Sequence, residues 1–423
     1  MKAAASRYAR VVVKFRLCER LTSRRAAPRR SGGMADEVDA SSKAFDEACL
    51  HGRLVHGSCG WAAKNQNLSI YTSAEMSSGV ARLPKYSEHF GCVEVDSSTY
   101  AIPSPDVVTR WVQNTPEGFT FLVKAFGGFC ASSVAKASLP RDVRELLETH
   151  SERVAYARMP EGAKDLLWAK FNESMEPITA AGRLGCVVFQ FHLSQPPGDS
   201  LREHILECKV RLKGAKMAIE FRNREWLTGD TGEETVRWAK DNDLLLVAAD
   251  ELEHETFQRD RAQTGLPPGA VRRRMFTRLE CTVDWGALIR VHRRHGTTER
   301  VLDAGEISFW AERIRDMSPK PSKGPIWVAW GTEWIDAPLT NAKNLDAAVD
   351  PSLRYDWHGS RHLRRPSRAK KSTIATMFAA AAKKSSSSGT RPDESSSKRR
   401  KKDETGPPQN PIATLWARAS REK

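Results

Sequence analysis

Eight short apolar runs between residues 56 and 331 constrain the fold of this chain more than any other feature of its sequence. They are apolar almost throughout rather than alternating with polar residues, which is typical of strands covered on both faces. We therefore predict one strand for each run. The eight runs are HGSCGW (56–61), CVEVDS (92–97), FTFLVKA (119–125), GCVVFQF (185–191), MAIEFR (217–222), LLLVAAD (244–250), ALIRVH (287–292) and PIWVAWG (325–331).

Helix-like segments separate most of these runs. Ser104 is a candidate N-cap with Pro105 at the first helical position, and an amphipathic segment closes on Gly214. Two further segments place acidic residues in their first turn, where the helix dipole favours negative charge. The four predicted helices occupy residues 104–115, 198–214, 231–243 and 305–317.

Eight strands alternating with helices over about 300 residues predict an α/β fold, a single TIM-barrel-like (β/α)8 domain. An open doubly wound sheet is the alternative, although no glycine-rich dinucleotide fingerprint favours it. We place the barrel at residues 46–350. The basic leader at 1–45 and the basic tail at 351–423 have compositions typical of disordered segments.

The positive charge of the chain lies in its two ends. Of the net charge of +15, residues 1–33 carry +9 and residues 361–423 carry +12, so residues 34–360 carry −6. The charge of the barrel therefore does not favour generic binding of nucleic acid, although basic tails can supply weak, salt-sensitive affinity for phosphate. The eight cysteines include no C-x-x-C pair, which fits a reducing compartment. No run approaches the roughly 20 apolar residues of a membrane span, so we predict no membrane partner.

Two signals in the terminal segments concern the location of the protein in the cell. Residues 1–33 are rich in Arg, Ala and Ser and resemble an organellar transit peptide; the alternative is that translation starts at Met34. The basic cluster KRRKK (398–402) is of the nuclear-import type. We predict a nuclear protein, with the mitochondrion or plastid as the alternative.

Six of the eight predicted strands end in an ionisable side chain, and the carboxyl ends of barrel strands carry the chemistry. Alternation places residues two apart on one face of a strand. Burying such charges unpaired is costly, so they either pair with one another, as Glu220 with Arg222 or Lys124 with Glu94, or form a site. The strand-end residues are Ser58, Cys59, Glu94, Asp96, Lys124, Gln190, His192, Glu220, Arg222, Asp250, Arg290 and His292.

These residues predict a site for an anionic ligand, because several cationic side chains converge on one mouth. Glu94 and Glu220 are the predicted catalytic acid and base. The oxygen and imidazole donors would also suit a divalent metal, although no H-x-x-E or H-E-x-x-H spacing favours one. The basic segment VRRRMFTR (271–278) would suit a nucleic-acid strand, a solvated loop being the alternative. The predicted ligand-binding residues are Lys124, Gln190, Arg222, Arg290 and His292.

Six blocks of the sequence resemble, in order, the DUF72 or YecE-like family over residues 55–348. They are SCGW, FGCVEVDSSTYAIPSPDVVTRWVQNTPEGFTFLVKA, LGCVVFQF, AIEFRNREW, LIRVHRRHG and NAKNL. The resemblance implies a TIM-barrel-like fold but no particular activity, since the activity of the family is unassigned. The family-typical positions are Gly60, Trp61, Glu94, Tyr100, Pro103, Trp111, Lys124, Gln190, Glu220, Arg222, Trp226, Arg290 and Asn341.

The chain departs from the family pattern at three places. FGGFC (126–130) stands where the family usually has a Thr-His pair, and AWGTEW (329–334) replaces an aromatic-Asn-Asn ending. The R-x-H-G block is stretched to RVHRRHG, which leaves His292 or His295 as its histidine. Because of these changes, the chain is not expected to keep every polar group of a mechanism common to the family.

The tail carries one apolar phrase twice, as KSTIATMF (371–378) and QNPIATLW (409–416). Each is typical of a short linear motif that folds on a groove. The second resembles the motif that docks on the eukaryotic DNA sliding clamp, whereas the first lacks the glutamine. The alternatives are that the two motifs bind another nuclear partner or that they have no function. The predicted partner-binding residues are Ile374, Met377, Phe378, Gln409, Ile412, Leu415 and Trp416.

Together these features predict a nuclear barrel protein, tethered by its tail to replication or repair machinery. The predicted activity is a hydrolase-type reaction on a nucleic-acid or phosphate-bearing substrate. A non-catalytic adaptor and an organellar small-molecule enzyme are the two alternatives. No cofactor is predicted beyond the divalent metal considered above.

Overall fold

The computed structural model describes residues 47–62, 68–72, 75–250, 277–292, 301–331 and 336–357. The leader, both tail motifs, the cluster 398–402, His295 and most of the basic segment 271–278 lie outside these ranges. The predictions made for those residues therefore stay predictions.

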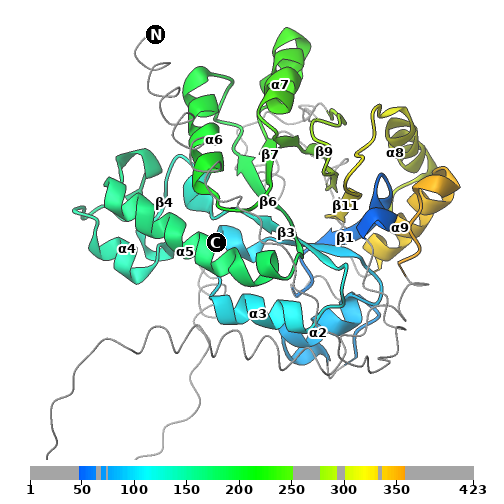
Figure 1. The fold of residues 1–423 in the computed structure, drawn as a ribbon, viewed down its shortest axis with the longest axis horizontal. Coiled ribbons are helices and arrows are strands. Elements are labelled where there is room, and N and C mark those ends of the chain that lie inside the picture. The colour runs from blue at the N-terminus through cyan, green and yellow to red at the C-terminus, as the bar shows by residue number, and fades with distance from the viewer. Residues whose placement is uncertain are drawn as a thin grey trace, which may run out of the picture. The chain divides into compact units, whose positions relative to one another are not determined.

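The central sheet is parallel throughout, and every predicted apolar run forms part of it (Figure 1). Each run pairs with the runs before and after it in the chain, and β1 also pairs with β11. The strands of this sheet are β1 (Leu54–Cys59), β2 (Cys92–Val95), β3 (Thr120–Lys124), β6 (Leu184–Phe191), β7 (Met217–Phe221), β8 (Leu245–Leu246), β9 (Ala248–Asp250), β10 (Ala287–Val291) and β11 (Ile326–Trp330).

The sixth run closes the sheet into a barrel. It consists of two short strands, of which β8 pairs with β7 and β9 pairs with β10. Between them, the backbone N–H of Val247 donates to the carbonyl of Ile219 at 2.9 Å. The two ends of the sheet therefore meet in one continuous run. This confirms the barrel and excludes the open sheet, in which two edge strands would remain unpaired.

Helices follow the strands and lie around the outside of the sheet (Figure 1). The four predicted helices are present, with ends shifted by one to three residues. Ser104 caps α3 through the N–H of Val107, and a capping box of Asp303 and Glu306 begins α8. The helices are α2 (Gly79–Tyr86), α3 (Pro105–Gln113), α5 (Glu161–Ala180), α6 (Asp199–Arg211), α7 (Gly229–Asp241), α8 (Ala304–Asp316) and α9 (Ala337–Ala348). Among the described residues, no helix is long and apolar enough to cross a membrane.

One excursion interrupts the alternation between β3 and α5. It contains the short helix α4 (Arg141–Glu145) and a two-stranded antiparallel sheet of β4 (Val134–Ala135) and β5 (Arg153–Val154). The sequence did not predict it, because strands of two residues leave no periodic pattern.

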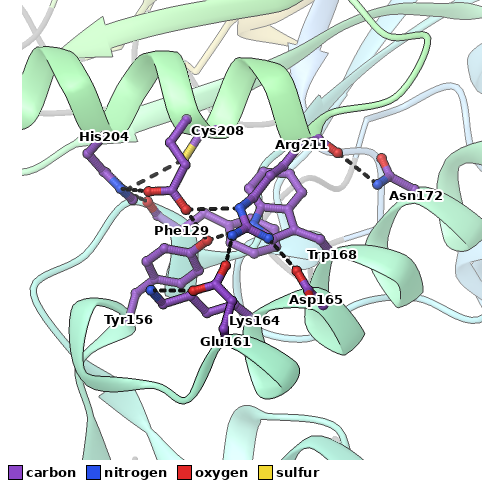
Figure 2. Close-up of polar contacts among 11 residues, drawn as sticks. Phe129, Tyr156, Glu161, Lys164, Asp165, Trp168, Asn172, His204, Cys208 and Arg211 are labelled. Atoms are coloured by element: carbon purple, nitrogen blue, oxygen red, sulfur yellow. Dashed lines mark hydrogen bonds and ion pairs between the residues drawn. The ribbon is translucent and has the colours of Figure 1, made fainter. Parts of the chain in front are cut away.

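Arg211 at the end of α6 ties that helix to α5 (Figure 2). Its guanidinium donates to Asp165 at 2.7 Å, to Glu207 at 2.9 Å and to Glu161. Close by, the indole N–H of Trp168 donates to the hydroxyl of Tyr156 at 2.9 Å. The network fixes the position of the helices that cover β3 and β6.

Strand alternation divides the apolar residues into an inner and an outer set. Cys92, Leu122 and Val188 belong to the cluster inside the barrel, whereas Val93 and Val95 pack with the helices. The interior is apolar toward the amino ends of the strands. Toward the carboxyl ends, the same alternation brings charged residues inside, and these form the site.

Candidate functional site

Arg290 lies at the centre of the carboxyl-end residues and joins two strands on opposite sides of it. Its Nε and Nη2 donate to the two carboxylate oxygens of Glu94 at 2.5 and 2.7 Å, and its Nη1 donates to Glu220 at 2.5 Å. Arg290 is 1% exposed and both glutamates are fully buried. The planar guanidinium thus makes a bidentate interaction with Glu94 and a single hydrogen bond with Glu220.

The electrostatics of this group favour full ionisation. Burial by itself would raise the pKa of Glu94, but Arg290 and Lys124 outweigh it and hold that pKa well below its ordinary value. Burial likewise opposes the lowering of the pKa of Glu220, which Arg222 and then Arg290 bring about. Two ionised carboxylates therefore neutralise the guanidinium inside the barrel.

Lys124 and Asp96 lie closer to solvent, with side chains 15% and 36% exposed. The ammonium of Lys124 is 2.9 Å from Asp96 Oδ1 and 3.6 Å from Glu94 Oε1, and it donates to Gln190 Oε1 at 3.0 Å. Burial, and then the charge of Glu94, raise the pKa of Asp96 to about 6. Asp96 is thus a carboxyl group that changes its charge near neutral pH, beside a permanently charged amine.

Arg222 and His292 complete the group. Arg222 is 5% exposed and pairs with the carboxylate of Glu220 through its Nε. The Nε2 of His292 is 3.2 Å from Nη2 of Arg290, so in the neutral ring it accepts from the guanidinium. A Cβ at Gly331 would lie 2.5 Å from the His292 ring, so a glycine is required there. His292 is therefore a residue of the site, whereas His295 lies outside the described residues.

The structure thus brings together all seven predicted site residues. The alternative considered from the sequence, that charged strand ends pair with one another, holds for Glu220 with Arg222 and for Lys124 with Glu94. Arg290 was predicted to bind an anion, and that role stays a prediction; in the structure its guanidinium is buried and pairs with two glutamates. The acid–base role of Glu94 and Glu220 stays a prediction, but full burial and ion pairing favour a role in holding Arg290.

Two residues of the site were not among the predicted site residues. Asp96 ends β2 next to Lys124, and the thiol of Cys59 is 3.8 Å from Nη2 of Arg290. Both stand among the strand-end residues of the sequence, and strand alternation places Asp96 on the same face as Glu94. The sequence alone does not show that Asp96 is partly exposed whereas Glu94 is buried.

A hollow of about 490 Å³ lies elsewhere, between the segment before β10 and the C-terminal half of α8. Its lining residues include Leu279 and Phe309. None of the charged residues described above lines it. In the described part of the chain, no group of three or more His, Cys, Asp and Glu residues has the arrangement of a metal site.

A family model, "Protein of unknown function DUF72", matches residues 55–360. The chain belongs to the DUF72 family. Over 199 residues it is 30% identical to the UPF0759 protein YunF of Bacillus subtilis, an alignment that covers 46% of this chain and 60% of YunF. Over 46 residues it is 44% identical to the UPF0759 protein YecE of Escherichia coli K12, or 11% of this chain and 17% of YecE. The chain thus spans less than two thirds of the length of either relative.

A crystal structure of a DUF72 family protein from Thermotoga maritima has a similar fold. It matches with a TM-score of 0.50 at 18% identity, over 70% of this chain and 99% of that protein. This likeness concerns the fold alone and agrees with the barrel.

In this DUF72 protein, the sequence FGGFC after β3 supplies apolar packing rather than polar groups. Phe126, Phe129 and Cys130 are buried. The Phe129 ring stacks on Trp168 of α5 with centroids 3.8 Å apart. The Thr-His pair expected there is thus replaced by side chains that anchor the excursion, and the polar rim at this point consists of Lys124 and Asp96.

Proposed function

We propose that the carboxyl-end site binds a phosphate-bearing ligand, with nucleic acid as the leading substrate class, and cleaves it by hydrolysis. The observation that carries this proposal is the partly exposed Lys124–Asp96 pair, 2.9 Å apart, above a buried and neutralised group of charges. The cation binds the phosphate, and the buried charges below hold it in place.

Asp96 is the base in the proposed reaction. Its pKa of about 6 leaves it ionised at pH 7 and able to take a proton from water. The water oxygen then attacks phosphorus, the bond to the leaving oxygen breaks, and that oxygen takes a proton from solvent. Asp96 suits this role better than Glu94 or Glu220, because its side chain is 36% exposed whereas both glutamates are fully buried.

The test is turnover of labelled DNA and RNA oligonucleotides, single- and double-stranded, with and without Mg²⁺, Mn²⁺ or Zn²⁺. We expect cleavage by the wild-type chain and its loss in Asp96→Asn. Lys323→Met is the control, because Lys323 also pairs with an aspartate, Asp284, but is 71% exposed and lies just before the amino end of β11. Cleavage retained in Asp96→Asn would contradict the proposed base.

A binding module without turnover is the second candidate function. The observation in its favour is that both buried glutamates are already paired with arginines, as in a purely binding site. Saturable binding of the same oligonucleotides with no product, in the presence of each metal, would favour this adaptor over the enzyme.

We further propose that the tail docks on the eukaryotic sliding clamp through Gln409, Ile412 and Trp416, with the copy at 371–378 as a weaker site. The support is the motif and its repetition. Titration of a 405–423 peptide against purified clamp should saturate, and Ile412→Ala with Trp416→Ala should abolish binding. Equal binding by both peptides would contradict the proposal.

Nuclear localisation is proposed from KRRKK at 398–402. Imaging of a fluorescent fusion should show it in the nucleus, and replacement of the cluster by alanines should redistribute it. Import into mitochondria or plastids that depends on residues 1–33 would instead favour the organellar enzyme.

A further inference from the structure

Tyr100 is a large aromatic side chain that the fold holds in solvent. It is 70% exposed, directly after the short 3-10 helix η3 (Ser97–Thr99) that follows β2. Within the described part of the chain, its side chain makes no hydrogen bond or ring contact. Single exposed apolar residues are ordinary on protein surfaces. Whether the exposure of Tyr100 is suited to binding a ligand therefore depends on how firmly its backbone is held.

That backbone is firmly held. The N–H groups of Tyr100 and Ala101 both donate to the carbonyl of Ser97, at 3.1 and 3.3 Å. Ser98 is fully buried, and its hydroxyl lies 2.9 Å from the carbonyl of Val95 and 2.6 Å from that of Lys124. The turn is thus fixed to the ends of both β2 and β3, while the ring it carries is exposed.

Two further contacts hold the turn from its far side. A Cβ at Gly127 would lie 3.0 Å from the carbonyl oxygen of Thr99, so the glycine allows the following turn to pack closely. The hydroxyl of Ser174 on α5 donates to the carbonyl of Pro103 at 2.5 Å. An exposed ring on a rigid support loses little entropy when a ligand stacks on it.

The position of the turn connects Tyr100 to the site. Asp96 precedes η3 and Tyr100 follows it, so about one helical turn separates the two residues. Lys124, the partner of Asp96, also supplies the carbonyl that holds Ser98. Tyr100 thus lies on the turn that follows the Lys124–Asp96 pair, about one helical turn along the chain from the proposed phosphate site.

We propose that Tyr100 is the stacking residue of this site and that it selects ligands with a nucleobase next to the phosphate. This inference rests on the proposed phosphate-binding function and names the substrate class more closely. Stacking on an aromatic ring accepts any base, since each has a π-face, so no preference among bases is expected.

The test compares two fluorescein-labelled hexamers with the same phosphates, one of thymidine and one abasic throughout, bound to the full chain. The wild-type chain should bind the thymidine hexamer about tenfold more tightly, and Tyr100→Ala should remove that difference while leaving the abasic affinity unchanged. Tyr100→Phe should keep it. Val210→Ala is the matched control, because Val210 is 72% exposed at the C-terminal end of α6.

The outcomes separate the two proposals. Equal wild-type affinity for both hexamers overturns the stacking role but leaves the phosphate site standing. Weaker binding of both hexamers by Tyr100→Ala also overturns it, because the residue would then only support the turn. Binding of neither hexamer by the wild-type chain overturns the proposed function, and the stacking role with it.

Discussion

At the scale of single residues, Arg290 determines how the charges inside the barrel are arranged. Its partners Glu94 and Glu220 are 196 and 70 residues away in sequence. The sequence predicted that charged residues end the strands, because alternation and apolar runs are local signals. It did not predict that one arginine would take both glutamates, since that pairing depends on how the barrel closes.

Arg290→Met should therefore be strongly destabilising, because it leaves two buried carboxylates without their shared cation. Removing one partner of a buried pair costs about 3–5 kcal/mol. Urea unfolding at pH 7 measures the loss, which should shrink toward pH 4 as the two glutamates, no longer in contact with Arg290, take up protons. Arg315→Met, at an exposed pair with Asp316, should cost less than about 1 kcal/mol. If Arg290→Met lost no more stability than Arg315→Met, the result would contradict the conclusion that Arg290 holds the two buried glutamates.

We expect the contribution of Asp96 to the stability of the protein to decrease as the pH rises. Its folded-state pKa of about 6 lies above the ordinary value of 3.8, so the native state binds more protons than the unfolded state between these values. The stability that this group contributes is thus full below about pH 4 and is lost as the pH rises through about 6. The stability of Asp96→Asn relative to wild type should increase from pH 4 to pH 7 in urea unfolding. A constant difference would mean that the pKa of Asp96 is ordinary.

At the scale of elements, the long regular parts of the fold were predictable and the short ones were not. All eight apolar runs form strands, because runs covered on both faces keep a continuous apolar pattern. The excursion between β3 and α5 left no such pattern. Its residues are specified by contacts such as the stacking of Phe129 on Trp168, which join positions far apart in sequence.

The ion-pair network of Arg211 gives a test at this scale. The side chain of Arg211 is 20% exposed, and Arg211→Ala removes its pairs with Glu161 and Asp165 of α5 and with Glu207 of its own helix. We expect a loss of about 1 kcal/mol. The loss should shrink at high salt, because partly exposed pairs are screened. Arg141→Ala, which removes one fully exposed pair within α4, is the control. Urea unfolding at low and high salt gives both values, and a loss that does not respond to salt would indicate packing instead.

At the scale of the whole molecule, charge is divided between an acidic body and two basic ends. We expect binding to nucleic acid to depend on salt mainly through those ends. Deletion of residues 361–423 should flatten the slope of log affinity against log salt for a single-stranded oligonucleotide, and by more than Lys124→Met does. Anisotropy titrations over a range of salt measure both slopes. An unchanged slope after the deletion would place the electrostatic contacts elsewhere.

The central claim is that Lys124 binds a phosphate at the carboxyl ends of the strands. The most direct test is the affinity of a chain ending at residue 360 for the abasic hexamer, measured for wild type, Lys124→Met and Lys323→Met. Loss of a charged hydrogen-bond partner should weaken binding by Lys124→Met about tenfold or more, and Lys323→Met should bind as wild type does. Equal affinity of all three proteins, each shown to be folded, would contradict the account.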